Sequence, residues 1–160
     1  MKLIISILSL LLFTSPPILL SEKYLYPTVN PIQCYNNPYI DKLLDALRYI
    51  ESSNGKYVLN INYKHGKEIS RDEGPYQHNS KCLIIFSNLY NDGRRYNPYD
   101  EEVSRRISRQ ILLDNYNYCK NWFDALVAYN CGLGRWYRNI PYESFIFAEK
   151  VIRKLYKEDL

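Results

Sequence analysis

The sequence predicts a mainly α-helical domain with one small β element. Most segments carry apolar residues at steps of three and four, the spacing that places side chains on one face of a helix. Residues 57–80 instead begin with an alternation of apolar and polar residues around a short turn, as β-hairpins do. Helical periodicity therefore dominates the chain, and the β element is confined to one segment.

The N-terminus has the layout of a secretory signal peptide. A lysine precedes an apolar stretch at residues 3–13, and small residues follow it. A membrane anchor is the alternative, since apolar character resumes at residues 18–20, but two prolines interrupt the stretch. We therefore expect residues 1–21 to be a signal peptide and the protein to be exported to the periplasm or cell envelope, or secreted.

The remainder is long enough for one domain and little more. Three prolines make residues 22–38 an extended lead-in, and residues 39–160 form the domain. The net charge of +4 is mild and its basic residues are scattered, so no nucleic-acid surface is expected, although a weak attraction to anionic polymers is.

Four cysteines lie behind the leader, and an even count in an oxidising compartment indicates two disulfides. Three pairings are open. No CxxC pair exists, and His65 and His78 lack the spacing of zinc ligands, so we expect no metal and no cofactor. The cysteines are Cys34, Cys82, Cys119 and Cys131.

Five helices are expected. The first runs from Tyr39 to the stop at Asn54-Gly55, with Asp41 in its first turn. The third is an amphipathic surface helix, and the fourth is stopped by Gly132 and Gly134. The other four are expected at residues 82–90, 101–115, 122–129 and 142–156.

Glu51 is the first candidate for chemistry. It continues the apolar stripe of Ile40, Leu44 and Leu47, so its carboxyl points toward the apolar side. Burial and the negative end of the helix macrodipole would both raise its pKa and keep it protonated near neutrality, as a general acid needs. The alternative is an ordinary helix-end residue that faces solvent.

Two further segments could line a cleft. Residues 70–80 are dense in hydrogen-bonding groups and include Asp72, Gly74 and Gln77, which is typical of a binding loop. Tyr129 and Asn130 end the helix at 122–129 and could project a phenol and an amide. A solvated turn and an ordinary helix stop are the alternatives.

In this order the three segments resemble the lysozyme-like superfamily, and the lytic transglycosylase (SLT domain) family in particular. Glu51-Ser52 is similar to its catalytic Glu-Ser, and residues 74–77 (GPYQ) to its Gly-Leu-Met-Gln loop. Residues 128–132 (AYNCG) resemble its Ala-Tyr-Asn-Ala-Gly segment, and residues 140–143 (IPYE) its Ile-Pro-x-Glu. The Pro-Tyr pair at 75–76 and the cysteine at 131 depart from the pattern.

The resemblance implies an α+β lysozyme-like fold in which a helical domain and a small β-hairpin lobe flank a glycan cleft. It implies cleavage of the β-1,4 bond between N-acetylmuramic acid and N-acetylglucosamine in peptidoglycan. As a lytic transglycosylase, Glu51 alone would serve as acid and then base and form 1,6-anhydromuramic ends. The substrate-binding residues it implies are Ser52, Asp72, Gly74, Gln77, Tyr129 and Asn130.

Two alternatives stay open. Residues 70–80 also match the corresponding loop of animal c-type lysozymes and of the transglycosylases that accompany secretion machines, so Asp72 could join Glu51 in a hydrolase. Asp72 could instead cap backbone amides near Gly74. The chain could also be an inactive glycan-binding protein of the same fold. We expect a monomer whose partner is the glycan strand, and an association with cell-envelope or secretion machinery is left open.

Overall fold

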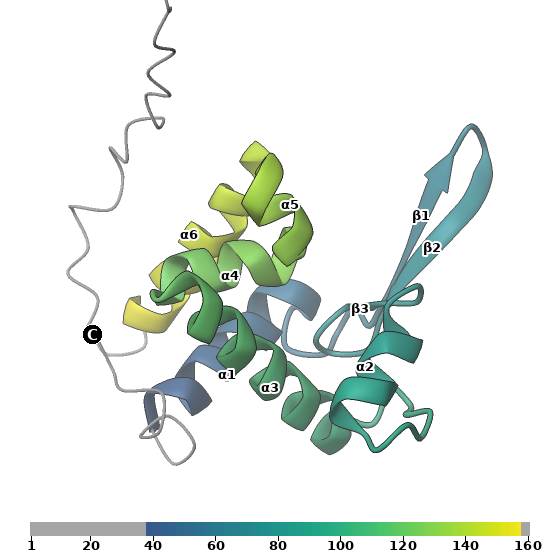
Figure 1. Ribbon diagram of the computed structural model, residues 1–160, viewed down its shortest axis with the longest axis horizontal. Helices are drawn as coiled ribbons and strands as arrows, with labels where there is room; N and C mark the ends of the chain where they lie inside the picture. Colours follow the sequence, from purple (N-terminus) through teal and green to yellow (C-terminus); the bar gives the residue numbers. More distant parts are fainter. Residues whose placement is uncertain (1–37, 158–160) are drawn as a thin grey trace, which may run out of the picture.

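The computed structural model describes residues 38–157, which form a mainly helical domain with a small antiparallel sheet (Figure 1). The predicted signal peptide, nearly all of the extended lead-in and Cys34 lie outside the described residues. The helices are α1 (Pro38–Ser52), α2 (Leu83–Tyr90), α3 (Glu101–Cys119), α4 (Trp122–Cys131), α5 (Leu133–Arg138) and α6 (Tyr142–Lys157). The strands are β1 (Leu59–Lys64), β2 (Lys67–Glu73) and β3 (His78–Asn79).

The main core lies where α1, α3, α4 and α6 meet. The predicted stripe of α1 is buried, with Ile40, Leu44 and Leu47 fully inaccessible to solvent. Trp122 at the start of α4 stacks on Tyr116 of α3, with ring centroids 4.3 Å apart. Because burial of large apolar side chains is the main stabilising contribution, these helices form a rigid platform for the end of α1.

Helices α3 and α4 have well-defined starts. The side chain of Asp100 accepts a hydrogen bond from the Val103 amide at the start of α3, and Asn121 does the same for Asp124 in α4. Such caps satisfy amides that have no partner within the helix. Between the two helices, Lys120 adopts a left-handed conformation and turns the chain so that α4 packs against α3.

The sheet has the order β1-β2-β3 and projects from one side of the helical body (Figure 1). Strand β2 pairs with β1 through the hairpin turn at residues 65–66, and its end pairs with β3. In this register Asp72 lies directly opposite Asn60 on one side and Asn79 on the other. The hairpin was predicted, whereas the short strand β3 was expected to be loop.

Three details of the helices correct the prediction. Helix α3 is longer than expected, since it continues to Cys119, and Ser104, Ser108 and Asn115 are buried along with its apolar residues. Gly132, with φ +82°, ends α4 as expected. Gly134 does not end a helix, because it lies inside the short helix α5. Pro38, assigned to the extended lead-in, begins α1, a position where its missing amide costs nothing.

Candidate active site

A cleft of about 840 Å³ lies between the sheet and the helical body. The end of α1 contributes Glu51, and strand β2 contributes Asp72. Gln77, Tyr129 and Asn130 also line the cleft, so the structure brings five of the seven predicted site residues to one cavity. Its other lining residues are Tyr57, Leu59, Asn60, His78, Asn79, Cys82, Phe86, Ile111, Cys131, Gly132 and Arg135.

Glu51 is half-buried at the edge of the core, one turn beyond the buried Leu47. Burial, and then the negative charge of Asp72, raise the pKa of Glu51 to about 8. The predicted rise is therefore confirmed, and the charge of Asp72 is a cause that was not predicted. No side chain of residues 38–157 hydrogen-bonds the Glu51 carboxyl, so its proton is available to a molecule in the cleft.

Asp72 is held by three amide groups. Its Oδ2 accepts hydrogen bonds from Asn62 Nδ2 at 2.8 Å and, at the long distance of 3.4 Å, from Asn60 Nδ2. Its Oδ1 accepts one from Asn79 Nδ2 at 2.7 Å. The register explains the arrangement, because Asn60 and Asn62 are two residues apart and point to the same face. Together these amides fix the orientation of the Asp72 carboxyl group.

The alternative that Asp72 caps backbone amides near Gly74 is wrong. Its two oxygens accept from asparagine side chains, and the Gly74 amide donates to the Val58 carbonyl at 2.8 Å. Glu51 and Asp72 therefore form a pair of carboxyl groups on the same cleft with contrasting surroundings. Glu51 is desolvated and inclined to hold a proton, whereas Asp72 accepts hydrogen bonds from three side-chain amides.

Gln77 and Asn130 are positioned by neighbours on their own side of the cleft. Gln77 Nε2 donates to the Gly74 carbonyl at 2.8 Å, which holds the side chain against the loop and leaves its amide oxygen unused. Asn130 Oδ1 accepts from Ser144 Oγ at 2.7 Å, which leaves the Asn130 amide NH₂ for the cleft. Both residues can thus offer one fixed polar group to a bound molecule.

Tyr129 lines the cleft, but its hydroxyl is engaged within the protein. The hydroxyl donates to the Tyr76 carbonyl at 3.1 Å and contacts Ser108 Oγ at 3.1 Å. Burial and the neighbouring Glu51 raise the pKa of Tyr129, so its hydroxyl stays neutral. Tyr129 therefore joins α4 to the loop after β2 and does not hold the Glu51 carboxyl by a hydrogen bond.

A buried chain of hydrogen bonds leads to the Tyr129 hydroxyl and holds it in place. Since Tyr129 donates to a carbonyl, Ser108 must donate to Tyr129, and His78 Nε2–H must donate to Ser108 Oγ at 2.8 Å. His78 Nδ1 is then an acceptor, and the Tyr96 hydroxyl donates to it at 2.7 Å. Each group donates once, which fixes one neutral tautomer. Burial of His78 lowers its pKa to about 3, in agreement with this assignment.

Ser52 and Gly74 do not line the cleft, so their assignment to substrate binding is corrected. Ser52 is 1% exposed, and its hydroxyl donates to the Pro75 carbonyl at 2.8 Å and accepts from the Gly55 amide. Gly74 has φ +78°, and a Cβ there would lie 1.8 Å from the Pro98 carbonyl oxygen. Both residues hold in place the loop that carries Gln77, and they thus affect the site indirectly.

The Pro-Tyr pair also turns away from the cleft. Tyr76 is fully buried in the main core, where its hydroxyl accepts a hydrogen bond from Arg105 at 3.0 Å. Arg105 in turn forms an ion pair with Asp45 at 2.5 Å. The Pro-Tyr pair thus contributes to core packing, and Gln77 and His78 form the neighbouring part of the cleft wall.

Several residues of the site were not predicted from the sequence. His78 was considered as a metal ligand and as part of the loop at residues 70–80, but its partners Tyr96 and Ser108 lie far from it in sequence. The asparagines of β1 could have been identified from the sequence, since Asn60 and Asn62 occupy alternate positions of the predicted strand. That alternation places both amides on the face of Asp72 once the hairpin register is known.

Cys82, Cys119 and Cys131 are free thiols in the described part of the chain, and Cys34 lies outside it. Burial raises the pKa of each of the three. No group of metal-ligating side chains occurs within residues 38–157. None of the helices in this part of the chain is long and apolar enough to cross a membrane.

Comparison with known proteins returned no match: no protein-family model, no curated protein and no solved structure matches this chain. The function must therefore be argued from the cleft itself.

Proposed function

We propose that this protein has a lysozyme-like fold and cleaves the β-1,4 bond between N-acetylmuramic acid and N-acetylglucosamine in peptidoglycan. The observation that carries the proposal is Glu51, a carboxyl group with a pKa of about 8 that faces a cleft and Asp72. A general acid works best when its pKa lies near the working pH. The cleft volume of about 840 Å³ lies within the range of ligand pockets.

Bond cleavage would begin with proton transfer from Glu51 to the glycosidic oxygen. The bond between that oxygen and C1 of the muramic residue breaks, the oxygen leaves with the proton as a hydroxyl, and positive charge develops at C1. Asp72 supplies a negative charge on the same cleft, where it stabilises this cationic state. Gln77 and Asn130 offer an amide oxygen and an amide NH₂ that suit the acetamido groups of the sugars.

Two different nucleophiles could then attack C1 of the muramic residue. In lytic transglycosylation, the Glu51 carboxylate removes the proton of the sugar's own 6-hydroxyl, which closes a 1,6-anhydro ring. In hydrolysis, the same carboxylate removes a proton from water, which adds to C1. The resemblance favours ring closure. The three amides around Asp72 are the specific observation that favours hydrolysis, because a two-carboxylate glycosidase needs a second carboxyl group fixed in position on the cleft.

The location of the activity belongs to the same proposal. The leader-like pattern at residues 1–21 supports export to the cell envelope, where peptidoglycan is found. We propose that the protein acts there as a monomer. Association with secretion machinery stays a prediction of the resemblance.

The proposal is tested by digestion of purified peptidoglycan and mass spectrometry of the soluble products. We expect wild type and the surface control E102Q to release muropeptides, and E51Q to release at least 10³-fold less because it keeps size but lacks the acid. Reducing muramic ends identify a hydrolase, and anhydromuramic ends identify a transglycosylase. Absence of products from wild-type protein contradicts the proposal and favours an inactive glycan-binding protein.

A further inference from the structure

A second hollow, of about 730 Å³, adjoins the cleft at helix α5. Cys131 and Arg135 line both cavities, so the two are neighbours at this point. The other residues that line the second hollow are Gly134, Arg138, Asn139 and Pro141. Two of its six lining residues are arginines, and none is acidic.

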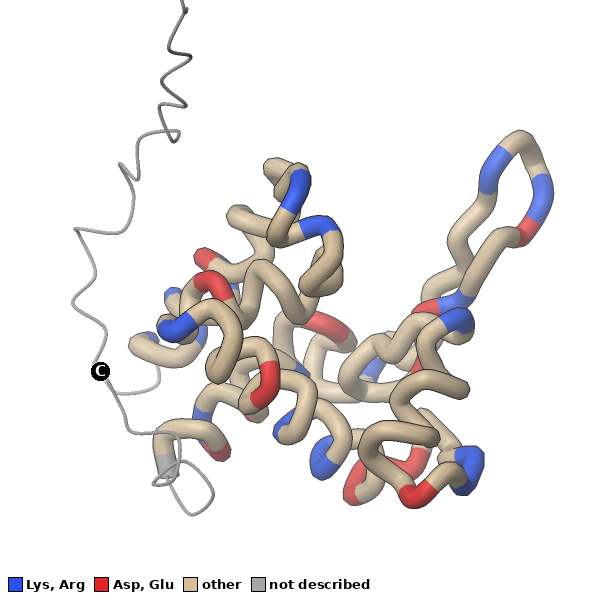
Figure 2. Tube along the Cα trace, in the orientation of Figure 1, with Lys and Arg blue, Asp and Glu red and all other residues tan. Residues whose placement is uncertain are grey.

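The arginines of α5 differ from those of α1 and α3. Arg48 pairs with Glu101, and Arg105 pairs with Asp45. Arg135 and Arg138 are exposed and have no carboxylate or carbonyl partner among residues 38–157. Figure 2 shows both basic positions on α5, at the top of the helical body.

We propose that Arg135 and Arg138 form a subsite that binds a carboxylate of the muramic residue or of its peptide stem. The proposal rests on the proposed function, because it identifies the part of peptidoglycan that occupies the second hollow. Guanidinium groups suit this ligand, since their planar donors match a carboxylate with two parallel hydrogen bonds. Glu51 and Arg135 line the same cleft, so a glycan held beside Glu51 would place substituents of neighbouring sugars near Arg135, which also lines the second hollow.

The chemistry of the substrate offers two sources for this carboxylate. Each muramic residue carries a lactyl ether, whose carboxyl group is free when the peptide has been removed. When the peptide is present, that carboxyl is an amide and the free carboxylates lie further out on the stem. A chitin oligosaccharide has neither group and is the neutral reference ligand.

The test measures binding of three ligands to the full chain that carries E51Q, so that no substrate is consumed. The ligands are peptide-bearing glycan strands, peptide-free glycan strands and chitohexaose. We expect R135Q/R138Q to weaken binding of at least one carboxylate-bearing ligand about tenfold, since charge-assisted hydrogen bonds contribute about that factor. Binding of chitohexaose should be unchanged.

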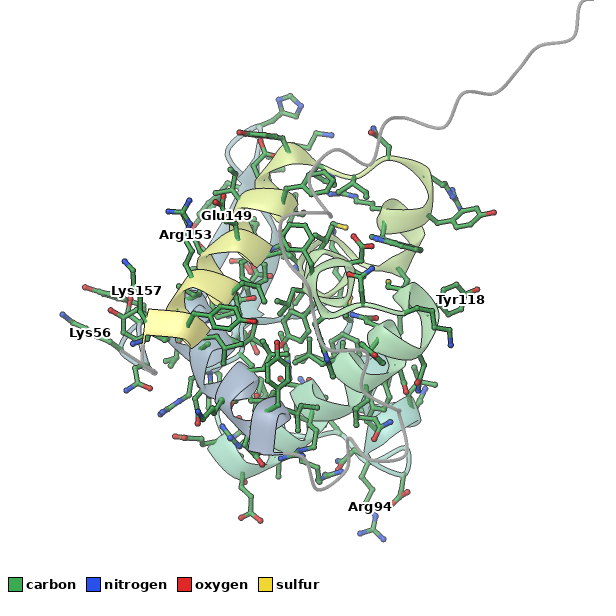
Figure 3. All side chains as sticks on the ribbon, turned by 90° about the vertical axis from the view of Figure 1, so that its left-hand side faces the viewer. Lys56, Arg94, Tyr118, Glu149, Arg153 and Lys157 are labelled. Carbon is green, nitrogen blue, oxygen red and sulfur yellow. The ribbon has the colours of Figure 1, made fainter. Side chains whose placement is uncertain are left out.

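The matched control is R94Q, because Arg94 is also exposed and lies at the opposite end of the molecule from α5 (Figure 3). A loss restricted to peptide-bearing strands assigns the subsite to the stem, and a loss shared by peptide-free strands assigns it to the lactyl group. Equal affinities for R135Q/R138Q and R94Q overturn the proposal, as does an equal loss for chitohexaose. Failure of the proposed function can be told apart from failure of the subsite proposal, because it appears as absence of cleavage by wild-type protein.

Discussion

Burial and the negative charge of Asp72 together raise the pKa of Glu51 to about 8. The relationship runs across the cleft, from the middle strand of the sheet to the end of α1. It makes the two carboxyl groups interdependent, since a change at Asp72 alters the proton affinity of Glu51. Each group can therefore be probed through the other.

The first prediction concerns the pH dependence of cleavage. Glu51 must be protonated to act as an acid, so activity should fall as pH rises through about 8. In D72N the neighbouring negative charge is absent, and the alkaline limb should move to lower pH while the maximum rate falls. The profile of kcat/KM against pH checks this. D92N, which alters an exposed loop, should keep the wild-type limb, and an identical limb in D72N would contradict the coupling.

The second prediction concerns stability. Because the pKa of Glu51 in the folded protein lies above its ordinary value of 4.5, its contribution to stability is complete below pH 4.5 and is lost as pH rises through 8. E51Q has no proton to lose. It should therefore unfold with a free energy about 2–4 kcal/mol above wild type at pH 8, and with little difference at pH 4.5.

Urea unfolding at the two pH values measures this difference. E102Q, which replaces an exposed glutamate at the start of α3, should differ from wild type by less than about 0.5 kcal/mol at both. A difference for E51Q that does not grow with pH would show that Glu51 is not held in a desolvated state.

The third prediction concerns His78. Its pKa in the folded protein, about 3, lies below its ordinary value of 6.5, so the protein should lose stability as pH falls from 6.5 toward 3. In H78L this loss should disappear. At pH 7, however, H78L should be less stable than wild type by about 1–3 kcal/mol, because the buried Tyr96 hydroxyl loses its acceptor.

The exposed histidine of the hairpin turn provides the control for unfolding measured at pH 7 and pH 4. His65 has φ +51°, a conformation that asparagine tolerates, so H65N should follow wild type at both pH values. If H78L and H65N lose equal stability between pH 7 and pH 4, the buried chain does not require a neutral histidine.

The fourth prediction separates the three amides around Asp72. N79A removes a donor at 2.7 Å and N62A one at 2.8 Å, and each should lower kcat about tenfold by weakening the hold on the carboxylate. N60A removes a donor at 3.4 Å and should have much less effect. Comparable losses in all three variants would indicate a general effect on the sheet.

Much of the fold and part of the site could be predicted because they depend on local pattern. The stripe of α1 placed Glu51 at the edge of the core, and alternation placed the hairpin. Ser52 and Tyr129 were placed correctly in their helices, but the hydrogen-bond partners of their hydroxyls were not predicted. Those partners, the Pro75 and Tyr76 carbonyls, belong to a loop whose path depends on packing. Periodicity carries no information about such contacts.

The last prediction concerns the loop itself. Gly74 and Gly66 both have positive φ, +78° and +73°, so alanine is strained at either position. At Gly74 the new Cβ would also lie 1.8 Å from the Pro98 carbonyl oxygen, whereas nothing lies within 4 Å at Gly66. G74A should therefore lose about 3 kcal/mol or more in free energy of unfolding, against about 1 kcal/mol for G66A. Because Gly74 also accepts the hydrogen bond of Gln77, G74A should raise KM where it still folds, and equal stability of the two variants would contradict the close approach of Pro98.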